Sequence, residues 1–450
     1  MNEPFDLTFS GGTVVSGQGM RRADVGVREG RIQAVEADLS ASPTRERIDV
    51  RGRWLFPGVI DVHVHPVYTD NMEQCSRVAA YGGTTTLIHF AYARTGENLV
   101  QAIEKFLKEG EASRLDFGLH AGLFDSPHQV PDIPQVMKLG VRSFKFFMTY
   151  LKQGWYTDDY QLIKAMDILA QNGGLAMVHA ENGGGIDYLE DKYLSGPNAS
   201  ARNFNLSRPA ILEEEAIFRA ICLAEVTGCP LYIPHVTARR SLRPIQAARQ
   251  AGQVVYAETC PHYLSLTEAI LEQRGALAKV GPPIRSADDQ LALWEALRDG
   301  VLQTVASDHA AKTKDPQGDF IAQGFGSPQI ETLLPITYDE GVNKGWISPV
   351  RLAQVLCENP ARIFGLYPRK GCLEPGADAD ILVFDPSRQF TIQAGNQHSN
   401  VGYTLFEGRT VLGWPEMTFQ RGRAVLRNGE VTAEVGVGQF LATQPSGKFL

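Results

Sequence analysis

The sequence predicts an α/β fold, namely a (β/α)8 TIM-like barrel with a small β-sandwich domain formed by both termini. Two observations predict it. Eight short apolar runs alternate with stretches of helical periodicity through the middle of the chain, as parallel strands and their connecting helices do. Short strand-like segments separated by glycine turns occupy both ends of the chain.

The eight runs are nearly continuous in apolar residues, which is typical of parallel strands that are buried on both faces. The predicted strands are 59–62, 84–90, 116–123, 143–148, 175–179, 231–235, 254–258 and 303–307. The clearest helical patterns between them are 99–107, 160–171, 213–227, 241–251 and 290–298.

The two ends of the chain share a sequence pattern that differs from that of the middle. Strand-like segments such as 12–15 and 31–35 near the start resemble 380–384 and 417–420 near the end, and neither end has many long helical patterns. We therefore expect residues 1–53 and 371–450 to pair into one β-sandwich domain, and residues 54–370 to form the barrel.

The composition of the chain limits the kinds of binding partner and the cellular location that we expect. The 450 residues suffice for one large domain and a smaller one, and the formal net charge of −8 argues against nucleic acid or an anionic membrane. No apolar stretch approaches the roughly 20 residues of a membrane span, and the acidic first residues do not fit a secretory signal. Six scattered cysteines without a Cys-x-x-Cys pair favour a reduced, cytoplasmic protein.

The most informative motif is the pair His63 and His65, which closes the first predicted strand. Residues at i and i+2 of a strand point to the same side, so both imidazoles can hold one metal ion. Neutral imidazole is a common ligand of zinc and similar ions. The alternative is an exposed strand with two solvated histidines.

Four further residues, Lys145, His179, His235 and Asp308, each follow an apolar run at or near its end. Active sites of (β/α)8 barrels lie at the carboxyl ends of the strands, so we expect all six side chains to converge at one mouth. Four histidines and one aspartate can bind two divalent ions. Zinc is the first expectation, and manganese, cobalt and nickel fit the same ligands.

Lys145 is unusual among these predicted metal ligands, because a protonated ammonium has no lone pair to donate to a metal ion. One interpretation is a salt bridge to Asp308 or another carboxylate. The other is that burial and nearby cations lower its pKa, so that the neutral amine adds carbon dioxide and becomes a carbamate able to bridge two ions.

Several segments together resemble the cyclic amidohydrolases of the amidohydrolase superfamily, and within them the D-hydantoinase/dihydropyrimidinase group. The resemblance extends over nearly the whole chain. The segments are 56–65 (FPGVIDVHVH), 80–85 (AYGGTT), 144–150 (FKFFMTY), 258–264 (ETCPHYL), 281–285 (GPPIR), 307–309 (SDH), 359–366 (NPARIFGL) and 376–380 (GADAD).

The resemblance implies a role for each ligand. His63 and His65 would hold the more buried ion together with Asp308, and His179 and His235 would hold the second. Lys145, carboxylated by carbon dioxide, would bridge both ions. The resemblance also suggests a homotetramer.

The resemblance further implies hydrolysis of a hydantoin or dihydropyrimidine ring to an N-carbamoyl amino acid by a hydroxide that bridges the two ions. Tyr150 would hydrogen-bond the substrate carbonyl oxygen, and Asp308 would pass the hydroxide proton to the leaving nitrogen. Gly281 and Thr332 stand where the group makes substrate contacts that are largely main-chain. Trp155, in the loop 154–159, favours bulky or aromatic ring substituents.

Two alternatives stay open. An allantoinase would open a related ring with the same ligands, and an assay with allantoin separates the two. A non-catalytic dihydropyrimidinase-like scaffold is less favoured, because such proteins have lost metal ligands and this chain keeps them.

Overall fold

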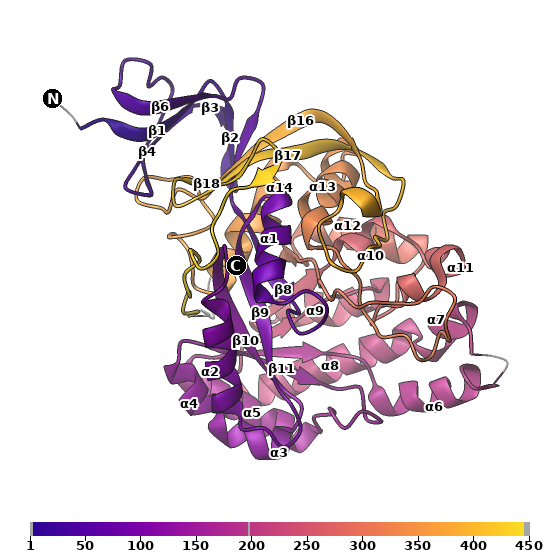
Figure 1. Cartoon of the computed structure of the whole chain (residues 1–450). Coiled ribbons are helices and arrows are strands. Elements are labelled where there is room, and N and C mark those ends of the chain that lie inside the picture. Colours follow the sequence, from indigo (N-terminus) through magenta and orange to yellow (C-terminus); the bar gives the residue numbers. More distant parts are fainter. Residues whose placement is uncertain (1–2, 197–198, 445–450) are drawn as a thin grey trace.

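The computed structural model describes residues 3–196 and 199–444, and its centre is a barrel of eight parallel strands in sequential order, surrounded by helices (Figure 1). This confirms the predicted fold class. The barrel strands are β8 (Val59–Val64), β9 (Thr84–Ala93), β10 (Asp116–Leu123), β11 (Ser143–Phe147), β12 (Leu175–His179), β13 (Leu231–Ile233), β14 (Val255–Thr259) and β15 (Thr304–Val305).

Two predicted strands end earlier than the apolar pattern suggests. The prediction 231–235 shortens to β13, because Pro234 has no backbone N–H to donate and His235 turns to a φ of 44°. The prediction 303–307 shortens to the two residues of β15, because Ser307 and the residues after it turn toward β8.

The barrel closes between its first strand and the segment after its last. The His309 N–H donates to the carbonyl of His63 at 3.3 Å, and the His65 N–H donates to the carbonyl of His309 at 2.9 Å. The buried carboxylate of Asp61 accepts from the Ser307 N–H at 3.0 Å. These bonds bring the carboxyl ends of β8 and β15 together.

Helices cover the outside of the barrel, and their ends follow local sequence signals. In α5, the Asp158 side chain caps the first turn by accepting from the Gln161 N–H, and Gly173 ends the helix with a φ of 67°. The helices are α1 (Met72–Tyr81), α2 (Leu99–Gly110), α3 (Ser126–Gln129), α4 (Ile133–Lys138), α5 (Asp159–Asn172), α6 (Gly183–Tyr193), α7 (Phe204–Ser207), α8 (Ala210–Thr227), α9 (Leu242–Gln250), α10 (Pro261–Ser265), α11 (Ile270–Arg274), α12 (Ala287–Asp299), α13 (Leu333–Tyr338), α14 (Pro349–Ala353) and α15 (Asn359–Ile363).

Strands from both ends of the chain pair with one another, as the sequence indicates. Leu55 in the seven-stranded sheet lies opposite Val383, and Phe9 in the four-stranded sheet packs edge-on against Phe419, with ring centroids 4.9 Å apart. The four-stranded sheet contains β1 (Phe5–Ser10), β4 (Asp24–Arg28), β5 (Arg31–Glu36) and β6 (Thr44–Asp49). The seven-stranded sheet contains β2 (Thr13–Ser16), β3 (Gly19–Arg22), β7 (Trp54–Pro57), β16 (Ile381–Thr391), β17 (Thr410–Gln420), β18 (Arg423–Arg427) and β19 (Glu430–Val431). The boundaries at 53/54 and 370/371 stay a prediction.

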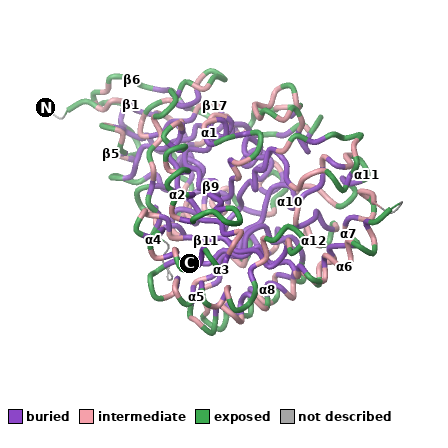
Figure 2. The backbone as a smooth tube through the Cα atoms, turned by 60° about the horizontal axis from the view of Figure 1, so that its bottom comes forward, coloured by how far each residue is buried: buried purple, intermediate pink, exposed green. Residues whose placement is uncertain are grey.

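Buried residues fill the middle of the molecule and exposed residues its outer helices and loops (Figure 2). All residues of β8, β9 and β10 are buried, as expected for strands covered on both faces. Within the described part of the chain, no helix combines the length and apolar content of a membrane span.

A buried ion cluster fastens the terminal sheets to the barrel. The Lys370 ammonium lies 2.6 Å from Asp116, 3.0 Å from Asp378 and 2.7 Å from Asp380. Burial alone would lower the pKa of Lys370, but these three carboxylates raise it above its usual range. Asp116 begins β10, so the cluster lies at the amino ends of the strands, opposite the end that carries the predicted ligands.

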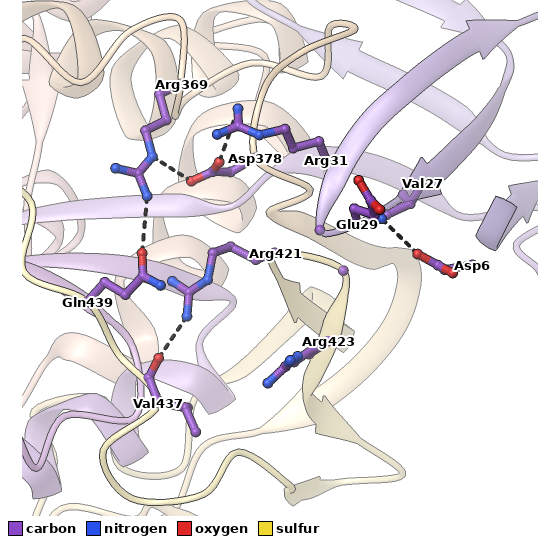
Figure 3. A pocket seen from close by; sticks show the side chains of 12 residues that line it. Asp6, Val27, Glu29, Arg31, Arg369, Asp378, Arg421, Arg423, Val437 and Gln439 are labelled. Carbon is purple, nitrogen blue, oxygen red and sulfur yellow. Dashed lines mark hydrogen bonds and ion pairs between the residues drawn. The ribbon is translucent and has the colours of Figure 1, made fainter.

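A cavity of about 640 Å³ adjoins this cluster, and its lining includes Arg31, Arg369, Arg421 and Arg423 (Figure 3). Arg369 donates to Asp378 at 2.9 Å, and Arg421 donates to the Val437 carbonyl at 2.7 Å and also contacts Asp116. These contacts tie the carboxyl-terminal segments to the base of β10.

Replacing the buried ammonium should destabilise the chain strongly. Lys370→Met leaves three carboxylates without their shared cation, and we expect a loss of about 3–5 kcal/mol in the free energy of unfolding. Arg31→Met removes an exposed cation 3.7 Å from the same Asp378 and should cost at most about 1 kcal/mol. Urea denaturation measures both, and equal losses would contradict the role given to Lys370.

Candidate metal centre

The six predicted ligands come together around one cavity of about 280 Å³ at the carboxyl ends of the strands. His63 lies near the end of β8, Lys145 in β11 and His179 at the end of β12, while His65, His235 and Asp308 lie in the residues just after β8, β13 and β15. All six line the cavity. Side chains separated by up to 245 positions therefore face one another, because the barrel gathers the ends of its strands.

His63, His65 and Asp308 form the tightest group, with one ligand atom from each within 4.8 Å of the others. One carboxylate oxygen, Asp308 Oδ1, lies 3.2 Å from His63 Nε2 and 2.9 Å from His65 Nε2. His63 Nε2 is buried and makes no hydrogen bond. Two imidazole nitrogens and a carboxylate oxygen that face one point suit a divalent cation.

The other nitrogen of each of these rings is fixed by a buried partner. His63 Nδ1 lies 2.6 Å from Glu258 Oε1, and His65 Nδ1 lies 2.9 Å from the Tyr92 hydroxyl. Glu258 is itself held by the Tyr232 hydroxyl, which donates to it at 2.7 Å. Such partners leave the Nε2 atoms of both histidines directed at the site.

His235 and His179 form the second group, beside Lys145. Their ring centroids are 4.5 Å apart, and Lys145 Nζ lies 3.4 Å from His235 Nε2. His179 Nε2 is occupied by Glu181 at 2.8 Å, and Arg208 donates to the same carboxylate oxygen at 2.8 Å. His179 therefore has only Nδ1 available for an ion.

Lys145 has no carboxylate partner among the described residues, so the salt bridge considered from the sequence is not formed. The side chain is 1% exposed and lies between the rings of Phe90 and Phe147. Burial lowers the pKa of Lys145 to about 8, against the opposing charges of Asp308 and Glu258. An amine of this kind reacts with carbon dioxide more readily than an ordinary lysine does.

Carboxylates set the electrostatics around these ligands. Burial alone would lower the pKa of His63, but Glu258 and Asp308 raise it to about 9. Burial would raise the pKa of Asp308, yet His63 and His65 hold it well below its usual range. The carboxylates that favour a proton on His63 also favour a metal cation in its place.

Three residues of the cavity have a left-handed backbone, which is uncommon outside glycine. The φ angles are 66° for Tyr150, 44° for His235 and 50° for Asp308. Such backbone strain persists where the surrounding structure fixes it, and it concentrates at functional sites.

Tyr150 and Gly281 also line the cavity, whereas Thr332 does not. The Tyr150 ring centroid lies 5.2 Å from that of His179, and a Cβ at Gly281 would come within 3.4 Å of the Tyr150 hydroxyl. The Thr332 hydroxyl donates instead to the Gln329 carbonyl at 3.1 Å. Gln329 and Ile330 donate their N–H groups to His309, which turns this loop away from the cavity.

Aromatic rings form one wall of the cavity. Tyr92, Phe124 and Trp155 stack in a row, with centroid distances of 4.7 and 4.3 Å. Trp155 comes from the loop that the sequence indicates for substrate recognition. The wall also includes Tyr68 and Phe325.

Comparison with known proteins agrees with the fold and the ligand cluster. The amidohydrolase family model matches residues 54–425. A D-hydantoinase of Ralstonia pickettii is 37% identical and an L-hydantoinase of Paenarthrobacter aurescens 35% identical, each over 97% of this chain and 98% of the relative. The crystal structure of a dihydropyrimidinase from Brevibacillus agri NCHU1002 superposes with a TM-score of 0.93 at 35% identity, covering 98% of this chain and 99% of that one.

The chain belongs to the amidohydrolase family. Within that family it is a cyclic amidohydrolase of the hydantoinase/dihydropyrimidinase type. Relatives named for opposite stereochemistry match it almost equally well, so overall identity does not indicate which enantiomer it prefers.

Removing the carboxylate behind His63 should weaken metal binding. Glu258→Gln keeps the size of the side chain but loses the charge that orients His63, and we expect metal affinity to fall about 10- to 100-fold. Competition with a fluorescent chelator measures the affinity. The control is Glu73→Gln. It alters a partly buried carboxylate on α1 that pairs with Arg114, and it should bind metal like the parent. Equal affinities for all three proteins would contradict this assignment.

Proposed function

We propose that this chain hydrolyses a cyclic amide ring, a hydantoin or a dihydropyrimidine, to an N-carbamoyl amino acid. The observation that carries the proposal is the convergence of four histidines, Asp308 and Lys145 on one cavity next to Tyr150. The names of the relatives, hydantoinase and dihydropyrimidinase, support the same substrate class. A cavity of about 280 Å³ accommodates such a ring beside bound ions.

We infer two divalent ions, with zinc expected first. His63, His65 and Asp308 would hold one and His179 and His235 the other, with Lys145 as a carbamate between them. His63 Nε2, which makes no hydrogen bond, and the buried Lys145 amine, which has no carboxylate partner among the described residues, both fit this arrangement. When bound, the ions supply a hydroxide at neutral pH and polarise the ring carbonyl.

The protein groups then have distinct tasks. The Tyr150 hydroxyl donates a hydrogen bond to the carbonyl oxygen as negative charge develops there. Asp308 accepts a proton and delivers it to the ring nitrogen as the carbon–nitrogen bond breaks. One water is consumed, and the open product carries a new carboxylate and a ureido group. The aromatic wall limits the access of bulk water.

The test of this function is a turnover panel with the metal-loaded protein. We expect ring opening of dihydrouracil, hydantoin or 5-phenylhydantoin, loss of activity after chelation, and its return with zinc, manganese, cobalt or nickel. Preferential opening of allantoin would favour the allantoinase alternative. A protein that binds no metal and opens none of these rings would be the scaffold. The homotetramer and the cytoplasmic location stay predictions.

The carbamate has its own test. Protein prepared with ¹³C-bicarbonate should show one carbamate carbon resonance per chain, and Lys145→Met should lack it. The variant should also bind at most one ion and lose nearly all turnover, because a thioether cannot bridge two cations. Lys108→Met, which removes an exposed lysine near the end of α2, should keep the resonance. A resonance that survives in Lys145→Met would contradict the assignment.

A further inference from the structure

A second lysine, Lys312, lines the same cavity from the loop after β15. Its ammonium lies over the Tyr68 ring, 4.1 Å from the centroid. Within the described ranges, no carboxylate or carbonyl oxygen accepts a hydrogen bond or forms an ion pair with this ammonium. A half-buried cation therefore faces the cavity without an anionic partner, which is costly unless a ligand supplies one.

Neighbouring lysines show how this region satisfies an ammonium that is structural. Lys279 Nζ donates to the carbonyls of Phe320, Ile321 and Gln323 at 3.0, 2.9 and 2.8 Å. Lys314 Nζ donates to the Lys279 carbonyl at 2.8 Å. Lys312 has no such set of acceptors, so its charge is not used to hold the loop together.

The loop nevertheless fixes where Lys312 lies. The Thr69 N–H donates to the Ala311 carbonyl at 2.9 Å, and the Tyr403 hydroxyl donates to the Lys312 carbonyl at 3.2 Å. The side chain passes over Gly324, where an added Cβ would come within 2.7 Å of Lys312 Cδ. The backbone is thus anchored on two sides, and the side chain has room because residue 324 is glycine.

The position of the ammonium sets the length of the ligand. The Tyr68 ring neighbours both residues: its centroid lies 4.1 Å from the Lys312 ammonium and 6.3 Å from the centroid of the His65 ring. A group bound to Lys312 is therefore set back from the ring carbonyl that reacts. A side chain on the substrate ring would link the reacting ring to a group bound at Lys312.

We propose that the substrate carries a carboxylate on a short side chain of the ring, and that Lys312 binds this carboxylate. This inference rests on the proposed ring-opening function and adds the substrate class. Lys279 also lines the cavity, but three carbonyls already accept from its ammonium. Because no arginine is part of this lining, a singly charged carboxylate suits Lys312 better than a phosphate. Burial lowers the pKa of Lys312 to about 8, and the charge of Asp308 partly offsets this effect.

The experiment compares matched substrates that differ only in charge. Hydantoin-5-acetic and hydantoin-5-propionic acids are assayed against their carboxamides, with the metal-loaded parent, Lys312→Met and Lys312→Arg. We expect the parent to prefer a carboxylate through a KM about 10- to 100-fold lower. Lys312→Met should remove this preference and leave kcat and KM for the carboxamide within about twofold of the parent. Lys312→Arg should retain much of it, and Lys108→Met should match the parent.

Calorimetric titration of the same ligand pairs reads binding without turnover and separates the two hypotheses. Tighter binding of the carboxylate that disappears in Lys312→Met supports the role of Lys312 even if neither ring is opened, and in that case only the proposed function fails. Equal affinity of the parent for both ligands would overturn the inference. So would a Lys312→Met variant that weakens carboxylate and carboxamide alike, since that pattern indicates a purely structural lysine.

Discussion

The backbone hydrogen bonds that join His309 to His63 and His65 are the contacts on which the geometry of the candidate metal site depends. They connect the first barrel strand to the segment after the last, and so bring Asp308 against two histidines that lie more than 240 positions away in the sequence. The remaining ligands enter through the strands between, which follow one another in order around the barrel. Closure of the barrel and assembly of the site are the same structural event.

Buried charge is organised at both ends of this barrel, but in opposite ways. At the amino ends, Lys370 forms ion pairs with three carboxylates, and these ion pairs connect the barrel to the terminal sheets. At the carboxyl ends, the buried Lys145 ammonium has no carboxylate partner among the described residues, and the buried His63 Nε2 makes no hydrogen bond. The contrast agrees with the general division of this fold into a stabilising face and a reacting face.

The sequence alone predicts the barrel strands and the candidate ligands because both depend on local pattern. The four histidines and Asp308 each follow an apolar run at or near its end, where this fold places active sites, whereas Lys145 lies within β11 and its bridging role comes from the family resemblance. The partners behind them could not be predicted: Glu258 and Tyr92 contact His63 and His65 only through the register and curvature of the barrel. The position of Thr332 could not be predicted either. Its loop is held by hydrogen bonds from the Gln329 and Ile330 N–H groups to His309, which no local pattern reveals, and Thr332 does not line the cavity.

The left-handed backbone of Tyr150, His235 and Asp308 has a consequence for how this protein can change. Each such residue costs on the order of 1–3 kcal/mol, a substantial part of the roughly 5–15 kcal/mol that keeps a domain folded. Glycine or asparagine at these positions would relax the backbone and at the same time remove a side chain of the candidate site. Stability gained by substitution at these positions would therefore come at the expense of the candidate site.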